Sequence, residues 1–337
     1  MTKRGIVIVI ILIVSIVVGF FAVNTILTGK KLLSPLSQNK PKNEEVKEKP
    51  LDKYTFENLK NRGGKKSEIK LERVLKEEQN FITYLFSYQS DGRKITGAAN
   101  IPQKEGKLPV VVMFRGYVDP ADYQTGIGTQ PAGEYFANRG YLTLAPDFLG
   151  YGESDAAPGN NLWEDTRFLR LTASIDLLAS VGSLSNADTN NIFLWGHSNG
   201  GMLALSVLEI TGGPYPTTLW APVSQYFPYD VLYYTYEAED KGKLVRAKLA
   251  EFEKDYDVNK YSPDEYWSWI TADIQLHQSL ADPYVPKSWS DNLSEKLKEQ
   301  NLSVIYYTYQ GANHNLQPTW DTVVERDVEF FQSHTEQ

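Results

Sequence analysis

The stretch Asn191–Met202, NIFLWGHSNGGM, decides how the rest of this 337-residue sequence is interpreted. Ile192–Trp195 is a short apolar run typical of a buried strand, and a helical run begins at Met202. Between them lies Gly-x-Ser-x-Gly, with Ser198 at its centre. A strand-to-helix turn this tight strains the backbone of its central residue, which flanking glycines make possible. We therefore expect the Ser198 hydroxyl to stand clear of a sheet edge, at a helix N-terminus that favours negative charge. The alternative is a glycine-rich turn whose serine has no chemical role.

The segments around this turn alternate between strand and helix patterns. Residues 81–88 and 94–101 predict a β-hairpin, with Asp91-Gly92 as its turn. Buried-strand patterns follow at 110–114, 141–145, 192–195, 218–220, 274–277 and 304–309. Helical periodicity lies between them at 133–138, 168–181, 202–210 and 288–299. This alternation predicts an α/β fold, with a mostly parallel sheet covered by helices on both faces. The active site of such a sheet lies at the carboxyl ends of its strands.

A nucleophilic serine needs a general base, and the base needs a carboxylate that orients it. Of the four histidines, His314 follows the last predicted strand, and Asp282 lies in the loop after the preceding strand. Both loops open at the sheet edge where Ser198 lies, so we expect Ser198, Asp282 and His314 to converge as nucleophile, acid and base. The alternatives are an ordinary loop histidine and a carboxylate that caps a proline turn. His197 cannot easily reach round to its neighbour, and His277 is expected to support the acid loop.

Acyl transfer also needs two donors for the developing oxyanion. One predicted donor is the backbone N–H of Asn199, at the start of the helix after Ser198. The other is predicted in the loop Arg115-Gly116-Tyr117, which follows the strand at 110–114. Tyr117 is the candidate there, through its backbone N–H or its hydroxyl.

Residues 80–333 resemble the catalytic domain of the prolyl oligopeptidase (S9) serine peptidases, or a close esterase relative in the α/β-hydrolase superfamily. The resemblance is carried by SYQSDGRKITGAANIP, LPVVVMFRGY, RGYLTLAPDFLGYGES, GHSNGGM, IQLHQSLADPYVP and YTYQGANHNL. It implies an α/β-hydrolase fold with the same three catalytic residues, and it makes Asp147 a structural carboxylate. Two positions depart from the family: Arg115-Gly116 replaces His-Gly in the oxyanion loop, and Ser279 replaces a glycine. The chain has no room for the β-propeller of full-length prolyl oligopeptidases.

The expected activity is hydrolysis of amide or ester bonds through an acyl-enzyme, with a small ester or a short peptide as substrate. An S9-type peptidase is the main expectation by resemblance, and a carboxylesterase is the alternative. A catalytically inactive hydrolase fold that serves as a binding module is a third possibility. No metal or other cofactor is expected, because no His/Asp/Glu cluster has metal-ligand spacing and no glycine-rich phosphate loop is present.

An insertion between two predicted strands, at about 222–270, is expected to form a cap over the serine. It carries a charged helical segment near 243–254 and many aromatic residues: Tyr226, Phe227, Tyr229, Tyr233, Tyr234, Tyr236, Trp267 and Trp269. These rings could line an acyl or leaving-group pocket. The alternative is that most of them pack the cap onto the domain.

The N-terminus predicts a membrane anchor over residues 1–27. After two basic residues, Ile6–Val23 is apolar apart from Ser15 and Gly19, and as a helix it would span about 27 Å, close to the thickness of a bilayer. A cleaved signal peptide is the alternative, although the run ends in a poor cleavage site. Residues 28–67 are polar and predict a disordered linker, which leaves 68–337 as the catalytic domain. The catalytic domain is expected outside the cytoplasm, although the lysines after the apolar run favour the opposite orientation.

Charge follows the same division. Residues 1–80 hold 16 Lys and Arg against 9 Asp and Glu, whereas the rest holds 18 of the 34 basic and 33 of the 42 acidic residues. A body this acidic argues against nucleic acid as a partner, because nucleic-acid binding needs a basic surface. The sequence has no cysteine, which excludes disulfides, thiolate metal sites and a cysteine nucleophile.

Overall fold

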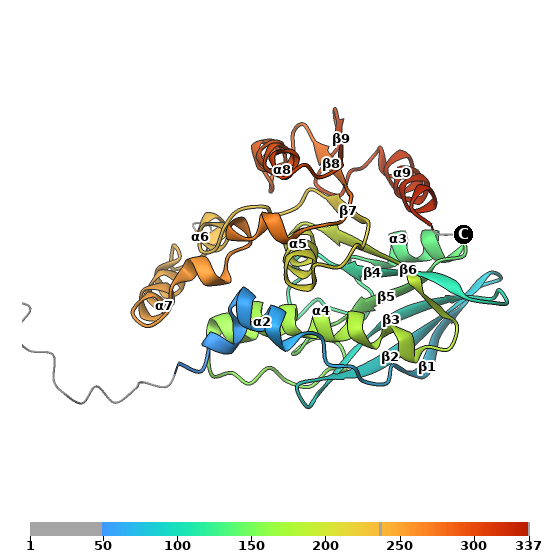
Figure 1. Cartoon of the computed structure of the whole chain (residues 1–337), viewed down its shortest axis with the longest axis horizontal. Helices are drawn as coiled ribbons and strands as arrows, with labels where there is room; N and C mark the ends of the chain where they lie inside the picture. Colours follow the sequence, from blue (N-terminus) through green and yellow to red (C-terminus); the bar gives the residue numbers. More distant parts are fainter. Residues whose placement is uncertain (1–48, 236–237, 336–337) are drawn as a thin grey trace, which may run out of the picture. The chain divides into compact units, whose positions relative to one another are not determined.

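The computed structural model describes residues 49–235 and 238–335. Its strands form one nine-stranded sheet in the order β1-β2-β3-β5-β4-β6-β7-β8-β9 (Figure 1). Their bounds are β1 (Lys70–Glu77), β2 (Phe81–Ser90), β3 (Arg93–Pro102), β4 (Leu108–Phe114), β5 (Leu142–Pro146), β6 (Ala187–His197), β7 (Thr217–Trp220), β8 (Ile274–Ser279) and β9 (Val304–Tyr309). The first three strands pair antiparallel with their neighbours, and β4 to β9 run parallel. The mostly parallel sheet and the hairpin are confirmed.

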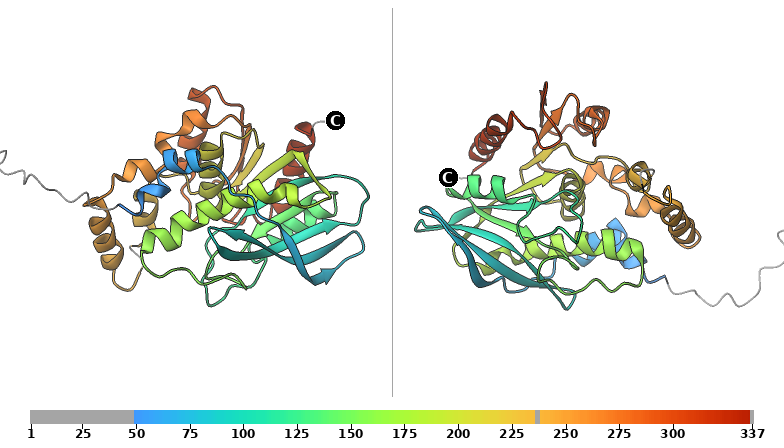
Figure 2. Two further views of the ribbon diagram at one scale, coloured as in Figure 1. Left: turned by 60° about the horizontal axis from the view of Figure 1, so that its bottom comes forward. Right: turned by 180° about the vertical axis from the view of Figure 1, so that it is seen from behind.

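Helices cover both faces of this sheet (Figure 2). On one face lie α3 (Gln130–Ala137) and α9 (Trp320–Ser333). The other face is covered by α2 (Phe56–Arg62), α4 (Leu169–Ser180), α5 (Asn199–Thr211) and α8 (Lys287–Glu299). The short helical turns are η2 (Asp52–Tyr54), η3 (Glu164–Phe168) and η4 (Val181–Ser183). The sheet therefore separates two apolar cores.

The central strand β4 shows how the sequence fills both cores. Val110, Val112 and Phe114 belong to the core under α4 and α5, whereas Val111 and Met113 belong to the core under α3 and α9. Successive side chains of a strand point to opposite faces, so a strand buried on both faces is a continuous apolar run. This is the pattern that the sequence showed at 110–114.

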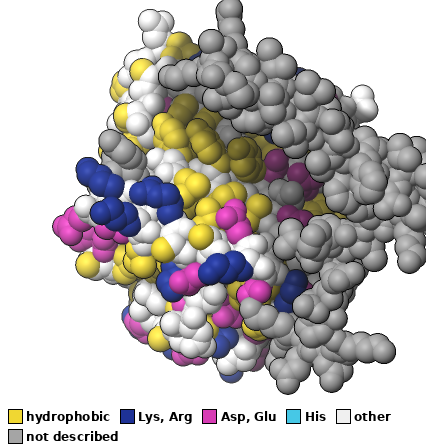
Figure 3. Space-filling model, turned by 90° about the vertical axis from the view of Figure 1, so that its left-hand side faces the viewer, with side chains coloured by type: hydrophobic (Ala, Val, Ile, Leu, Met, Phe, Trp, Pro, Cys, Tyr) yellow, Lys and Arg dark blue, Asp and Glu magenta, His cyan; other side chains and the backbone are white. Residues whose placement is uncertain are grey.

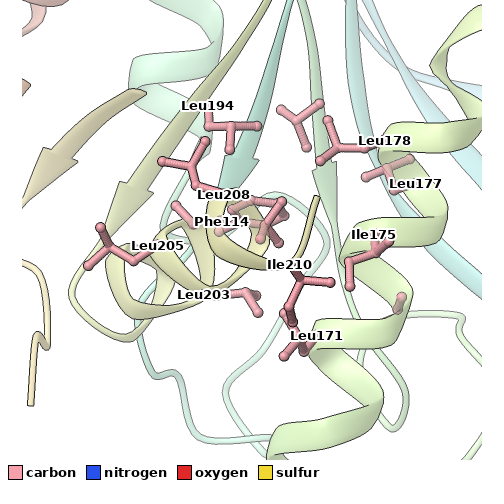
Figure 4. Packing of buried hydrophobic residues seen from close by; sticks show 14 of the residues in the cluster. Phe114, Leu171, Ile175, Leu177, Leu178, Leu194, Leu203, Leu205, Leu208 and Ile210 are labelled. Carbon is pink, nitrogen blue, oxygen red and sulfur yellow. The ribbon is translucent and has the colours of Figure 1, made fainter. Parts of the chain in front are cut away.

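The larger core holds α5, and with it the turn at Ser198, against the sheet. Figure 4 shows Leu171 and Ile175 of α4 pointing toward Ile210 of α5, with Phe114 of β4 and Leu194 of β6 beside them. All five residues are at least 95% buried. Each apolar side chain buried in this way contributes about 1.5–3 kcal/mol, so the turn rests on a rigid base.

The predicted linker is wrong for residues 49–67, because this segment is folded. Thr55 caps α2 by accepting a hydrogen bond from the Asn58 backbone N–H, at 3.2 Å. Leu51, Phe56 and Leu59 are buried in the larger core. The sequence of this segment looks like a polar linker because it contains few apolar side chains. They are buried against α5 and against residues of the 222–270 insertion.

Strand β1 was also missed, and it is an edge strand. Its side chains are almost all exposed, so it lacks the alternation that marks a half-buried strand. It pairs with β2 through two register shifts and carries several charges, both of which discourage further strands from adding to a sheet edge.

The insertion at 222–270 is a separate layer of short helices. It comprises α6 (Tyr229–Thr235), α7 (Lys243–Glu253), η5 (Val258–Tyr261), η6 (Pro263–Glu265) and η7 (Trp267–Trp269). Phe227 and Trp267 are buried in the larger core, whereas the tyrosines of α6 and Tyr226 are exposed. The aromatic residues therefore divide between packing and surface; Tyr236 lies outside the described residues.

The predicted membrane anchor at 1–27 and the linker up to residue 48 also lie outside the described residues. Within residues 49–235 and 238–335, no helix combines the length and the apolar character that crossing a bilayer requires.

Candidate active site

Ser198 occupies the strained turn that the sequence predicted. Strand β6 ends at His197, α5 begins at Asn199, and Ser198 between them has φ +56° and ψ −121°. Its backbone is held on both sides: its N–H donates to the Trp220 carbonyl oxygen at 2.9 Å, and its own carbonyl accepts from the Val223 N–H at 3.0 Å. A positive φ is costly for a residue with a side chain, so the fold imposes this conformation.

The glycines around Ser198 are required by space. A Cβ at Gly196 would lie 2.6 Å from the carbonyl oxygen of Gly200, and a Cβ at Gly200 would collide with the carbonyl oxygen of Phe114. These contacts let the first turn of α5 pack directly against the ends of β4 and β6. The Gly-x-Ser-x-Gly spacing is thus a steric requirement of the turn.

The structure brings His314 and Asp282 together. His314 Nδ1 lies 2.8 Å from Asp282 Oδ2, and the Asp282 side chain is fully buried while that of His314 is 13% exposed. Asp282 Oδ1 also accepts hydrogen bonds from the backbone N–H groups of Tyr284 and Val285, at 2.8 and 2.9 Å. When Nδ1–H donates to the carboxylate, Nε2 of His314 carries the lone pair that a general base needs.

Asp282 is held in its charged form. Burial by itself would raise the pKa of Asp282, but the hydrogen bonds from His314 and from the Val285 and Tyr284 N–H groups outweigh it. The pKa of this carboxyl is therefore below its usual value. An ionised carboxylate at this position stabilises the imidazolium that a base becomes after it accepts a proton.

His197, whose side chain was not expected to reach Ser198, contacts His314, the predicted base. Its Nε2 lies 3.1 Å from the carbonyl oxygen of His314, and the two rings are 4.7 Å apart. Desolvation and the nearby His314 lower the pKa of His197 to about 4, so its ring is neutral at pH 7 and Nε2–H donates. The residue before Ser198 thus holds the loop of His314. A histidine beside the central serine was the only sequence signal for this contact.

Of the two predicted oxyanion donors, Asn199 follows Ser198 directly along the chain, and Tyr117 follows a glycine that lies against Ser198. Asn199 is the first residue of α5, where backbone N–H groups have no partner within the helix. The loop 115–117 lies against Ser198, because a Cβ at Gly116 would be 3.1 Å from Ser198 Cβ. The Tyr117 side chain, directly after it, is 66% exposed.

Arg115 supports this loop at the position where the family has histidine. Its Nη1 donates to the Gly116 carbonyl oxygen at 2.9 Å, and its guanidinium lies 4.4 Å from the Tyr123 ring and 4.3 Å from the Tyr151 ring. Asp147 closes the same cluster by accepting from the Tyr123 hydroxyl at 2.7 Å. Burial raises the pKa of Asp147, which lies inside the fold and serves the loop's support.

His277 does not support the acid loop as expected. It is fully buried, with Nδ1 2.7 Å from the Tyr309 hydroxyl and Nε2 3.0 Å from Asp327 Oδ1, and so it ties β8 to β9 and α9. The acid loop is linked to the loop of His314 by Ser279, whose hydroxyl donates to the Ala312 carbonyl at 2.5 Å. The serine that replaces the family's glycine therefore makes a contact that glycine cannot.

An aromatic surface extends from His314 onto α6. The Tyr284 ring meets the His314 ring edge-on at 5.3 Å, and the Tyr234 hydroxyl donates to the Tyr284 carbonyl at 3.2 Å. Tyr233 packs against Trp289 at 4.8 Å, yet remains 42% exposed. Seen from the side where α6 and α7 lie in Figure 1, hydrophobic side chains gather on the surface beside charged ones (Figure 3).

The structure also holds a cavity that lies apart from these residues. This cavity of about 560 Å³ lies among β1, β3, β5 and α3 and is lined by polar residues such as Asn100, Gln130 and Thr143, with none of the predicted site residues. In the part of the chain that the structure describes, no three His, Asp or Glu side chains are grouped to hold a metal ion.

Comparison with known proteins agrees with this geometry. Residues 131–337 match the model of the prolyl oligopeptidase family, and residues 31–212 match the model of the acetyl xylan esterase family. Among curated proteins, a sequence search finds no match.

Solved structures share the fold at low sequence identity. Acetyl xylan esterase from Paenibacillus sp. R4 is 20% identical with a TM-score of 0.62, over 82% of this chain and 92% of that chain. Acetyl xylan esterase 1 from Thermoanaerobacterium sp. JW/SL YS485 is 16% identical with a TM-score of 0.58, over 85% and 94%. A puromycin-hydrolyzing peptidase from Mycobacterium tuberculosis is 19% identical with a TM-score of 0.59, over 76% of this chain but 40% of that one. Since each family model matches more than half of the chain, the protein belongs to the serine hydrolases of the α/β-hydrolase superfamily, in the group formed by the prolyl oligopeptidase and acetyl xylan esterase families.

Proposed function

We propose that Ser198, His314 and Asp282 form the catalytic triad of this serine hydrolase. The observation that carries the proposal is the 2.8 Å contact of His314 with a buried, ionised Asp282, beside a serine in a strained strand-to-helix turn. His314 Nε2 removes the proton of the Ser198 hydroxyl as its oxygen attacks the substrate carbonyl. Asp282 stabilises the imidazolium and keeps the ring in the productive orientation.

The tetrahedral oxyanion then needs its donors. We assign them to the backbone N–H of Asn199 and to Tyr117, through its N–H or its hydroxyl. His314 returns the proton to the leaving amine or alcohol, which departs and leaves an acyl-Ser198 ester. Water, activated by His314 in turn, releases the acid and restores the serine. Removing a single oxyanion donor costs about 10²–10³ in kcat in well-studied hydrolases.

Labelling with a fluorophosphonate probe tests the nucleophile. The wild type should be labelled at Ser198, whereas Ser198→Ala should not react. Asp282→Asn should keep the fold but react far more slowly, because the histidine loses its orienting anion. If neither wild type nor variant is labelled, the chain is the inactive, binding form of this fold and the proposal fails.

Peptides and esters are both candidate substrates. The prolyl oligopeptidase model matches the half of the chain that holds all three triad residues, which favours an S9-type peptidase. The alternative is a carboxylesterase, and domain content favours it: the chain covers more than 90% of two acetyl xylan esterases but 40% of the peptidase chain. Short p-nitrophenyl esters should be compared with Pro- and Ala-linked peptide p-nitroanilides. Turnover of the esters alone would rule out the peptidase.

We further propose that residues 1–27 anchor the protein in a membrane, with the catalytic domain outside the cytoplasm. The support is the sequence alone, namely the apolar run Ile6–Val23 after two basic residues. Protease treatment of intact cells should remove the catalytic domain, and the protein should fractionate with membranes at its full mass. A soluble protein that lacks the first residues would instead indicate a cleaved signal peptide.

A further inference from the structure

Two arginine side chains at the oxyanion loop form no ion pair with a carboxylate, although the positive charge of Arg115 acts on the buried Asp147. No ion pair joins Arg115 or Arg170 to an acidic side chain within residues 49–235 and 238–335. Two other arginines, both half-buried, are paired: Arg167 Nη1 lies 2.6 Å from Asp230 Oδ2, and Arg62 Nη1 lies 2.8 Å from Asp176 Oδ1. Among the described residues Arg326 likewise has no carboxylate in an ion pair, since its Nη1 donates to the Tyr309 hydroxyl at 2.9 Å. What sets Arg115 and Arg170 apart is that each has a buried Nε without a hydrogen-bond partner.

Arg170, on α4, is the less satisfied of the two. Its one hydrogen bond runs from Nη2 to the Tyr151 hydroxyl at 3.3 Å, and its buried Nε has no partner. The guanidinium lies 5.3 Å from the Tyr151 ring and 5.9 Å from the Phe148 ring. Taken as a whole, the residue is half-buried.

The contacts of Arg170 place it beside the predicted catalytic centre. The Tyr151 hydroxyl, which accepts from Arg170, itself lies 3.4 Å from the Val118 carbonyl oxygen. Tyr117, the preceding residue, also feels the positive charge of Arg170, which opposes the rise that burial causes in the pKa of Tyr117. Gly116, next along the loop, touches Ser198. Arg170 thus lies next to the segment that meets the nucleophile.

The positive charges of Arg170 and Arg115 lie close together, which is unfavourable unless an anion binds beside them. Burial and the neighbouring Arg115 lower the pKa of Arg170, although guanidinium remains charged at any physiological pH. A largely buried cation without a counter-ion is costly, and an anion that accepts its free N–H groups recovers that cost. The planar guanidinium fits a carboxylate through two parallel hydrogen bonds.

We propose that Arg170, with Arg115 behind it, binds a free carboxylate of the substrate, which makes the preferred substrate an anionic ester or amide. The inference rests on the proposed function of Ser198. A carboxylate suits the site better than a phosphate, because Asp119 lies near Tyr117 and the body is acidic, so a doubly charged group meets more repulsion.

Matched esters test the inference on the unmodified protein. Mono-p-nitrophenyl glutarate and p-nitrophenyl butyrate compare a charged with a neutral acyl chain. Phenyl acetate and 4-acetoxybenzoate make the same comparison in the leaving group. At low salt, kcat/KM should favour the charged ester of one pair by about 10- to 100-fold, as a charge-assisted hydrogen bond predicts. Equal values within both pairs would overturn the inference.

Variants and a stability assay locate the effect. Arg170→Met should bring the charged-to-neutral ratio close to one, Arg170→Lys should retain part of it, and the exposed Arg73→Met should keep the wild-type ratio. Glutarate should raise the melting temperature of the wild type and of Arg73→Met but not of Arg170→Met, and inorganic phosphate should have a smaller effect. Suppose that Ser198-dependent turnover persists, but neither the charged-to-neutral ratio of kcat/KM nor the melting temperature responds to a carboxylate. This inference then fails, while the proposed function stands. If no substrate is turned over, the proposed function fails, and the stability assay still decides anion binding.

Discussion

The imidazole of His197 donates a hydrogen bond from Nε2 to the carbonyl oxygen of His314, at 3.1 Å. The residue before the proposed nucleophile therefore holds the backbone of the proposed base. This contact joins the end of β6 to the loop after β9.

The role of His197 can be separated from a catalytic one. His197→Gln keeps an N–H donor of similar reach, whereas His197→Leu removes it and should lower kcat about five- to tenfold, as loss of one hydrogen bond predicts. Because the pKa of His197 is about 4, neither variant should move the pH–rate profile above pH 5. Kinetics on p-nitrophenyl acetate measure both effects. A wild-type kcat in His197→Leu would show that the contact is dispensable.

Gly116 provides a steric test of the oxyanion loop. Gly116→Ala adds a Cβ that would lie 3.1 Å from Ser198 Cβ, so the loop must move away from the nucleophile. We expect kcat to fall by at least tenfold, with little change in melting temperature, because oxyanion donors act only at the correct distance. Gly182→Ala is the control, since its Cβ would meet only the Thr189 methyl group at 3.4 Å. Full activity in Gly116→Ala would remove this loop from the oxyanion site.

The folded N-terminal segment makes a buried ion pair that mutation can test. Arg62 donates to both carboxylate oxygens of the fully buried Asp176, at 2.8 Å each. Arg62→Met leaves that carboxylate without its cation and should lower the free energy of unfolding by about 3–5 kcal/mol. Arg73→Met, which breaks an exposed pair with Glu153, should leave the urea midpoint unchanged. Equal midpoints for both variants would mean that the segment adds little stability.

Glu209 should make stability depend on pH. It is fully buried on α5, neither carboxylate oxygen has a hydrogen-bond partner, and burial raises its pKa well above 4.5. The folded state therefore binds a proton that the unfolded state releases. This stability is fully present below about pH 4.5 and is lost as the pH rises through the folded pKa. Glu209→Gln should flatten the profile of melting temperature against pH over this range, whereas the exposed Glu299→Gln should not. Parallel profiles for wild type and Glu209→Gln would contradict the prediction.

The features predicted correctly from the sequence depend on neighbours along the chain. The turn at Ser198 follows from its glycines, and the strand at 110–114 follows from an unbroken apolar run. Strand β1 was missed because an exposed edge strand lacks a periodic pattern. The segment 49–67 was misread as a linker because its few apolar residues are buried by distant parts of the chain, such as Tyr266, which stacks on Phe56 at 5.0 Å.

The sequence by itself determined the α/β fold and the order of Ser198, Asp282 and His314, because backbone sterics and hydrophobic periodicity are local properties. Only the tertiary structure decided which groups meet. It paired His314 with Asp282, set His197 against the base, and left Arg170 without a carboxylate. Burial and charge pairing depend on residues far apart in the chain, so the folded arrangement alone shows which polar groups remain free to bind a substrate.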